Sequence, residues 1–207
     1  MAGKHAILVL EYVDEPKDSR DKILKEAHFI EKKLLAKQDT TAKVFETQHA
    51  FGDWMSSDDS KGLTKIHIVS HGNWEEVGRY NGAGLADYIR AHIRGKRDLR
   101  SITIHSCFSG AKHPKKDEIL VQQFASRLLT HLKSDFSQYI VVRGYDGASF
   151  TDTEGRNWSL KEGVTIPDYR TREREEVFTQ SSTKPRLMAR PKFAISNTPG
   201  YRGVDAV

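Results

Sequence analysis

Cysteine and long apolar segments are both scarce in this sequence, and each shortage excludes a class of protein. Cys107 is the only cysteine among 207 residues, so the chain can form neither an internal disulfide bond nor a multi-cysteine metal site. The longest apolar runs, 5–10 and 139–142, are far shorter than the roughly 20 residues that cross a bilayer as a helix. These shortages exclude a membrane-spanning protein and favour a reducing compartment.

The beginning of the sequence carries no pattern of a secretion signal. Its short apolar run leads directly into Glu11 and Asp14, with no Ala-x-Ala type cleavage site between them. We therefore expect a cytoplasmic location. Delivery into another cell by a specialised secretion machine would leave no such mark and stays open.

The excess of positive charge lies mostly at the C-terminal end. The formal net charge is +5, but residues 183–207 hold five basic residues against Asp205 alone. The basic residues of this stretch are Lys184, Arg186, Arg190, Lys192 and Arg202. Because residues 1–182 are nearly neutral, an extensive nucleic-acid-binding face is not expected. We expect one domain over 1–182 and a basic tail over 183–207 that could contact a polyanion or an acidic partner.

Apolar residues follow strand-like and helix-like spacings in turn along the first 145 residues. Strand patterns occur at 5–13, 42–48, 65–71, 101–107 and 139–143. Helical spacing occurs at 18–37, 85–93 and 121–132, with Asp18 or Ser19 placed to cap the first helix. The stretch 52–62, rich in Ser and Asp, predicts a loop. This alternation predicts an α/β fold with a mainly parallel sheet and helices on both faces.

The pattern weakens beyond Ser149. Residues 164–166 and 192–195 predict short peripheral strands, and 171–179 predicts a short charged helix.

Two reactive side chains stand at the ends of successive predicted strands. His71-Gly72 ends the third strand and Cys107 ends the fourth. Ligands of open α/β sheets bind outside the carboxyl ends of the strands, and successive strands are usually neighbours, about 4.8 Å apart. An imidazole and a thiol brought together there can act as proton-transfer partner and nucleophile in acyl transfer. The N–H of Gly72 could donate to the oxyanion that forms.

The two blocks, Ile66-His-Ile-Val-Ser-His71-Gly72 and Ile102-Thr-Ile-His-Ser-Cys107-Phe-Ser-Gly110, resemble the signature of the caspase-like (clan CD) cysteine peptidases. The local likeness is greatest to metacaspases and related bacterial self-processing and effector peptidases. The resemblance implies a caspase-like three-layer sandwich and a thiol endopeptidase that cleaves proteins and could also cleave itself. It implies Cys107 as nucleophile, His71 as proton donor to the leaving amine, and the N–H groups of Gly72 and Cys107 as oxyanion hole. It implies neither a cofactor nor a metal.

The same resemblance indicates where substrate would bind, with two departures. The cysteine block lacks the Gln-Ala-Cys-Arg-Gly of caspases, which removes the ground for expecting a preference for Asp. The metacaspase Asp two residues before the cysteine is His105 here, so a preference for Arg or Lys before the cleaved bond cannot be carried over. The segment after the fifth strand, with Tyr145 and Asp146, occupies the place where this clan shapes its specificity pocket. Trp74, three residues after His71, could border the cleft. We therefore expect these four residues to bind substrate.

Other interpretations of the same residues remain open. The chain could be a catalytically inactive caspase-like module that binds through its basic tail. A different α/β hydrolase or transferase could use Cys107, although no Gly-x-Ser-x-Gly elbow or phosphate loop is present. A lone cysteine after an apolar strand is usually a small buried hydrophobe. Because His67 and His105 lie inside strands, we expect them to be hydrogen-bonded core or near-site residues rather than metal ligands.

Overall fold

A seven-stranded sheet organises the chain, in the order β11-β10-β7-β6-β3-β1-β2. The computed structural model describes residues 3–11, 16–131, 140–145, 147–151, 157–160, 192–196 and 203–206. The five parallel strands are β1 (Gly3–Val9), β2 (Thr40–Phe45), β3 (Leu63–Val69), β6 (Ser101–His105) and β7 (Ile140–Arg143). They match the five predicted strands in order and approximate position.

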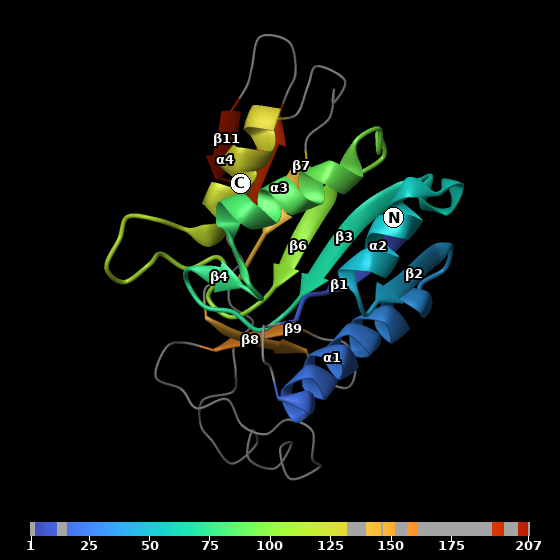
Figure 1. The fold of residues 1–207 in the computed structure, drawn as a ribbon, viewed down its shortest axis with the longest axis horizontal. Coiled ribbons are helices and arrows are strands. Elements are labelled where there is room, and N and C mark those ends of the chain that lie inside the picture. Colours follow the sequence, from blue (N-terminus) through green and yellow to red (C-terminus); the bar gives the residue numbers. More distant parts are fainter. Residues whose placement is uncertain are drawn as a thin grey trace.

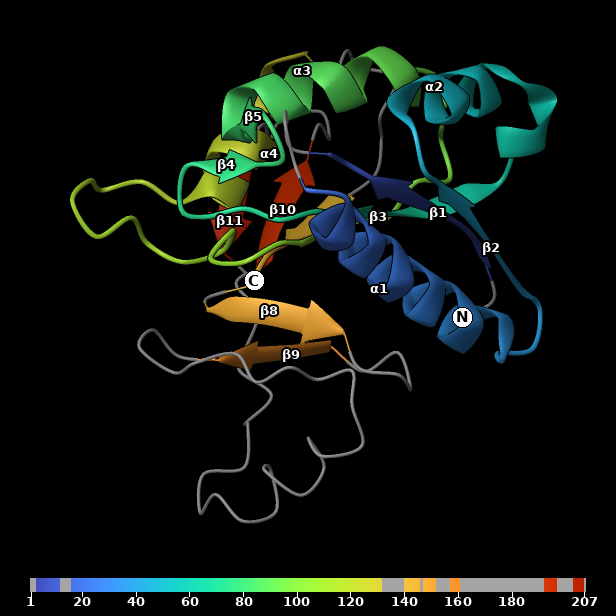
Figure 2. The same ribbon diagram turned by 60° about the horizontal axis from the view of Figure 1, so that its bottom comes forward.

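Helices cover both faces of this sheet, as Figures 1 and 2 show. One face packs against α1 (Lys17–Leu35), and the other against α2 (Gln48–Ser56), α3 (Gly82–Ile93) and α4 (Leu120–His131). Neighbouring residues of one strand divide between the two cores, because successive side chains point to opposite faces: Ile7 packs with α1, and Leu8 packs with the other helices. The predicted α/β fold is confirmed, and it is consistent with a caspase-like three-layer sandwich.

Helix α1 forms where the apolar spacing predicts it, but its predicted cap is wrong. Ile23, Ala27, Ile30 and Leu34 are buried at intervals of three and four residues, which places them on one helical face. The helix begins at Lys17 after Pro16, with no side-chain hydrogen bond at the cap. Neither Asp18 nor Ser19 therefore caps it, and the hydroxyl of Ser19 is engaged elsewhere.

The predicted loop at 52–62 is also wrong, since much of it is helical. Helix α2 extends to Ser56, and a 3-10 turn, η1, covers Asp58–Ser60. The side chain of Thr47 caps α2 by accepting a hydrogen bond from the N–H of Ala50 at 3.2 Å. Phe51, Trp54 and Met55 are buried, so a helical apolar face exists within this polar stretch.

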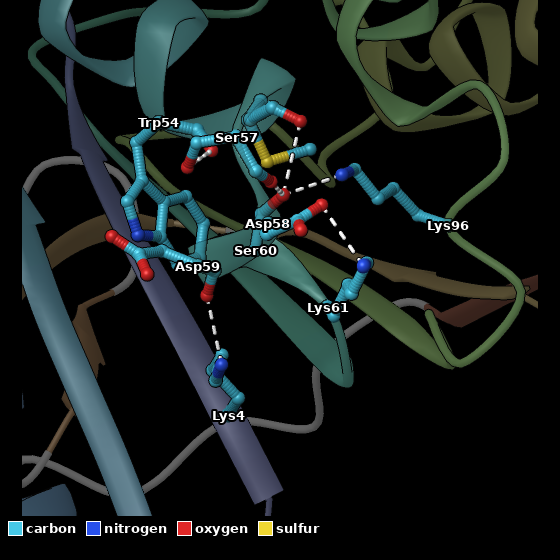
Figure 3. A network of polar contacts seen from close by, with 9 residues as sticks. Lys4, Trp54, Ser57, Asp58, Asp59, Ser60, Lys61 and Lys96 are labelled. Carbon is cyan, nitrogen blue, oxygen red and sulfur yellow. Dashed lines mark hydrogen bonds and ion pairs between the residues drawn. The ribbon is translucent and has the colours of Figure 1, made fainter.

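Three lysine side chains contact the η1 turn near the amino end of β1, as Figure 3 shows. Lys4 of β1 donates to the carbonyl of Asp59 at 2.8 Å, and Lys96 donates to the buried hydroxyl of Ser60. Lys61 pairs with Asp58 at 2.9 Å. This end of the sheet is therefore closed by polar contacts, and the strands run from it toward the opposite end.

The stretch predicted as a separate basic tail contributes two strands to the main sheet. β10 (Lys192–Ser196) pairs antiparallel with β7, and β11 (Gly203–Ala206) pairs antiparallel with β10. The strand predicted at 192–195 is confirmed, but a boundary at 182 does not separate the domain from this stretch. The other basic residues of the tail, the strand predicted at 164–166 and the helix predicted at 171–179 lie outside the described residues.

Two hairpins, β4 (Glu76–Val77) with β5 (Tyr80–Asn81) and β8 (Ala148–Thr151) with β9 (Asn157–Leu160), were not predicted. β4 and β5 follow the end of β3 closely, whereas β8 follows β7 and contacts α1. In the part of the chain that the structure describes, no helix is both long and apolar enough to cross a membrane.

Candidate active site

The segments that carry His71 and Cys107 leave the sheet side by side. Strands β3 and β6 are parallel neighbours, with Val69 paired to His105 in the register. The N–H of Ser70 donates to the carbonyl of His105 at 3.1 Å, so the pairing continues to the point where both chains turn away. The two strand ends predicted to be neighbours are neighbours.

The imidazole of His71 is anchored by the first turn of α1. Its Nε2 lies 2.8 Å from the hydroxyl oxygen of Ser19. The main chain at His71 is held as well, because its carbonyl accepts from the N–H of Gly78 at 2.9 Å. Ser19 is 52 residues away in sequence, and it looked like a helix cap; only the folded arrangement identifies it as a partner of His71.

Gly72 is required by the chain's own packing. A Cβ at this position would overlap the main-chain oxygen of Glu76 and the hydroxyl of Ser106. Gly72 forms an isolated bridge with Val77, and the flanking hydrogen bonds come from Asn73 and Gly78. Among the described residues, no main-chain carbonyl accepts from the N–H of Gly72 or of Cys107. This arrangement suits the two N–H groups to the oxyanion-binding role expected of them.

The thiol of Cys107 is partly exposed and meets the backbone of β8. Its Sγ accepts from the N–H of Ser149 at 3.3 Å and lies 3.7 Å from the Ser149 carbonyl oxygen, to which the thiol can donate. Burial raises the pKa of the Cys107 thiol above its ordinary value, the Ser149 N–H opposes this, and the carboxylate of Glu26 raises it further. Cys107 therefore rests as a neutral thiol at neutral pH.

Glu26 brings a buried carboxylate to the same edge of β8. Its side chain on α1 is 7% exposed, and Oε2 accepts from the N–H of Thr151 at 3.2 Å. Ser149 and Thr151 are two residues apart, so their N–H groups point the same way and stand roughly 6.6 Å apart along the strand. One edge of β8 thus faces both the thiol and a carboxylate. No sequence pattern singles out Glu26, because its neighbours form an ordinary amphipathic helix.

The residues after Cys107 tie its loop to the end of β7. The hydroxyl of Ser109 accepts from the N–H of Tyr145 at 3.2 Å and donates to the carbonyl of Ser106 at 3.0 Å. The N–H of Gly110 donates to the carbonyl of Tyr145 at 2.7 Å. The Ser-Gly pair of the cysteine block therefore has a structural role, since it fixes the loop that presents the thiol.

Phe108, next to the thiol, has an unusual backbone conformation. Its φ of 56° lies in the left-handed region, which is uncommon for a bulky residue. The N–H of Phe108 donates to the carbonyl of Gly147 at 2.9 Å. Its ring stacks on that of Trp74, with centroids 4.3 Å apart and 26° between the planes. Trp74, expected to border the substrate cleft, is thus joined directly to the cysteine loop.

His105 and Tyr145, also expected to bind substrate, instead belong to a row of rings that crosses β1, β3 and β6 and ends at Tyr145, just after β7. In this histidine row, His5 Nδ1 lies 3.2 Å from His67 Nε2, His67 Nδ1 lies 2.9 Å from His105 Nε2, and His105 Nδ1 lies 3.3 Å from the Tyr145 hydroxyl. With 6% and 2% exposed, His105 and Tyr145 present almost no surface to a substrate. The prediction that His67 and His105 are hydrogen-bonded core residues is confirmed.

Asp146, the remaining substrate-binding candidate, lies outside the described residues. Within the described ranges, no cluster of three or more His, Cys, Asp or Glu side chains could hold a metal ion. The sequence matches no family model, and no curated protein matches it.

Proposed function

We propose that this protein is a caspase-like cysteine endopeptidase in which Cys107 and His71 form the catalytic dyad. The observation that carries the proposal is the pairing of β3 with β6, which brings both reactive residues to one end of the sheet. Both side chains are partly exposed, although the residues before them, Ser70 and Ser106, are buried. Protein chains, including copies of this one, are the proposed substrates.

The reaction follows from the chemistry of the two side chains. The Cys107 sulfur attacks the scissile carbonyl carbon, and the thiol proton passes to the imidazole of His71. The N–H groups of Gly72 and Cys107 donate to the oxyanion. His71 then returns the proton to the leaving amine as the C–N bond breaks, which leaves a thioester on Cys107. Water hydrolyses the thioester, giving the new carboxyl terminus and the free thiol.

Because the Cys107 thiol is neutral at rest, the reaction steps above require two changes at the sulfur atom. Because the pKa of Cys107 is raised, the proton must leave at the moment of attack rather than beforehand. The contact between Sγ and the backbone of Ser149 must also open, since the sulfur needs access to the substrate carbonyl. Substrate binding along β8 would replace this contact and exclude water.

The test compares the wild type with Cys107→Ala and His71→Ala on an unfolded protein substrate and on the chain itself, with new termini identified by mass spectrometry. His49→Ala is the matched control, because this exposed histidine lies on α2. We expect cleavage by the wild type and the control only. Equal cleavage by all four proteins, or none by the wild type together with no labelling of Cys107 by a thiol-directed peptide ketone, would refute the proposal.

The contact of a neutral thiol with β8 also favours the alternative, a catalytically inactive caspase-like module that binds through its basic C-terminal residues. It predicts no proteolysis and a salt-sensitive retention of the full chain on a polyanion such as heparin. Retention should fall when Lys184, Arg186 and Arg190 are replaced by Gln.

A further inference from the structure

Among the described residues that follow β3 and β6, the loops that carry His71 and Cys107 each expose a short stretch. Around the thiol, Ser106, Ser109 and Gly110 are buried, whereas Cys107 and Phe108 are partly exposed. In the other loop Ser70 is buried, and the residues from His71 to Trp74 are partly exposed. A substrate that reaches the thiol therefore meets this short surface, which ends in the stacked rings of Trp74 and Phe108.

The two stacked rings connect the loop that carries His71 with the loop that carries Cys107, because each loop contributes one ring. Trp74 follows His71 by three residues and Phe108 follows Cys107 directly. The left-handed backbone of Phe108 is unfavourable for any residue with a side chain, yet a large apolar side chain stands there. Strain of this kind is held in place by the surrounding structure, and it concentrates at functional sites.

The proposed chemistry fixes which side of the cleaved bond passes these rings. His71 must protonate the leaving amine, so the residue after the scissile bond must depart along the His71 loop toward Trp74. The residues before the bond lie toward β8, where Ser149 contacts the sulfur. The rings of Trp74 and Phe108 thus lie on the leaving-group side.

The charge next to the rings is already neutralised. Glu75 follows Trp74 directly, but its carboxylate pairs with Lys116 at 2.7 Å and with His113 at 3.0 Å. A charged substrate residue would find no uncompensated partner in this group, whereas an apolar residue could cover the ring surfaces and leave water.

We propose that Trp74 and Phe108 form a platform that binds an apolar or aromatic side chain at the substrate position immediately after the scissile bond. The inference rests on the proposed peptidase function and adds a substrate preference to it. Trp74 and Phe108 act here through direct contact with substrate, and they do not take part in proton transfer.

The experiment measures kcat/KM for quenched fluorescent peptides that differ only after the scissile bond, with Phe, Leu, Gly or Lys there. The full-length wild type is compared with Trp74→Ala and with Phe108→Gly, in which glycine tolerates the left-handed backbone. Tyr80→Ala is the matched control, because Tyr80 also belongs to a stacked aromatic pair, with Tyr88. We expect the wild type to prefer Phe or Leu over Gly by about tenfold or more. The two platform variants should reduce this ratio to about twofold, and the control should retain it.

Equal kcat/KM of the wild type for all four peptides would overturn the platform and leave the peptidase proposal standing. An equal loss of kcat/KM on all four peptides in both variants would do the same. Absence of all cleavage would count against the peptidase itself. A second measurement does not need turnover. Calorimetry measures the affinity of the Cys107→Ala protein for Phe-Gly-Gly-amide, a peptide that represents the departing product. Trp74→Ala in that background should weaken binding about tenfold, and unchanged affinity, or no binding to either protein, refutes the platform.

Discussion

The histidine row should make folding stability sensitive to acid, and His5 is the residue at which this can be measured. Burial lowers the pKa of His5 from 6.5 to about 4, and the nearby charges of Lys65 and Lys37 lower it further in the same direction. In the unfolded chain the imidazole takes up a proton near pH 6.5, whereas in the folded chain it stays neutral until about pH 4. The contribution of the neutral His5 ring to the free energy of unfolding is therefore fully present above pH 6.5, and it is lost as the pH falls toward 4.

The size of the loss follows from the two pKa values. At about pH 4.5 the unfolded chain binds more protons at His5 than the folded chain does. For a ring shielded from water, this difference lowers the free energy of unfolding by about 2.5 kcal/mol. His5 is only partly buried, so solvent screening reduces the expected contribution to about 1–2 kcal/mol. That is a sizeable fraction of the stability of an ordinary domain.

The assay is urea unfolding of the wild type and of His5→Gln at about pH 7.5 and about pH 4.5. Glutamine keeps an amide that can hydrogen-bond to His67 but does not titrate. We expect the variant to lose about 1–2 kcal/mol less than the wild type on acidification, whatever its stability at pH 7.5. His49→Gln, which removes an exposed histidine of α2, should lose as much as the wild type. An equal acid-induced loss of unfolding free energy in His5→Gln and the wild type would show that the folded chain does not resist protonation of His5.

Two further predictions concern the proposed catalytic residues, Cys107 and His71. Glu26→Gln removes the carboxylate that raises the pKa of Cys107, so the midpoint of iodoacetamide labelling against pH should move to lower pH; an unchanged midpoint would mean that the charge of Glu26 does not reach the thiol. Ser19→Ala releases the imidazole of His71, so kcat should fall about tenfold with little change in KM, and Ser19→Thr, which restores the hydroxyl, should recover most of it. Equal kinetics for Ser19→Ala and the wild type would exclude a positioning role.

The central strands β1, β3 and β6 could be predicted because they are buried on both faces and appear in the sequence as continuous apolar runs. The same reasoning failed at α2, where Gly52 and Asp53 interrupt the apolar residues and the polar composition resembled a loop. Tertiary packing decided that case: Phe51, Trp54 and Met55 enter the core of α2, α3 and α4. β10 was predicted as a strand, but nothing in its sequence indicates that its partner is β7.

The placement of His71 and Cys107 at neighbouring strand ends could be predicted from short motifs. The residues that contact their side chains could not, for a physical reason. His71 and Cys107 each stand at the end of a strand, a position that local sequence reveals. Ser19 lies 52 residues from the imidazole that it meets, Ser149 lies 42 residues from the thiol, and Glu26 lies 125 residues from Thr151. Such contacts depend on how α1 and β8 pack on the sheet, which no local pattern records.

In the histidine row, the alternating pattern of each strand determines which face a ring lies on, and the register between strands determines which rings are neighbours. His5, His67 and His105 each occupy a strand position that faces α1, which alternation alone allows. Only the register places them on a diagonal: His67 stands beside Ile7 and Thr103, so each ring lies two residues further along its strand than the ring before it. The diagonal ends two residues before Cys107, at the same strand ends where the register also aligns His71 with the thiol loop. One pairing of β1, β3 and β6 therefore determines both arrangements. A register slip of a single residue in β3 would move His67 to the opposite face, away from His5 and His105, and would shift His71 relative to Cys107.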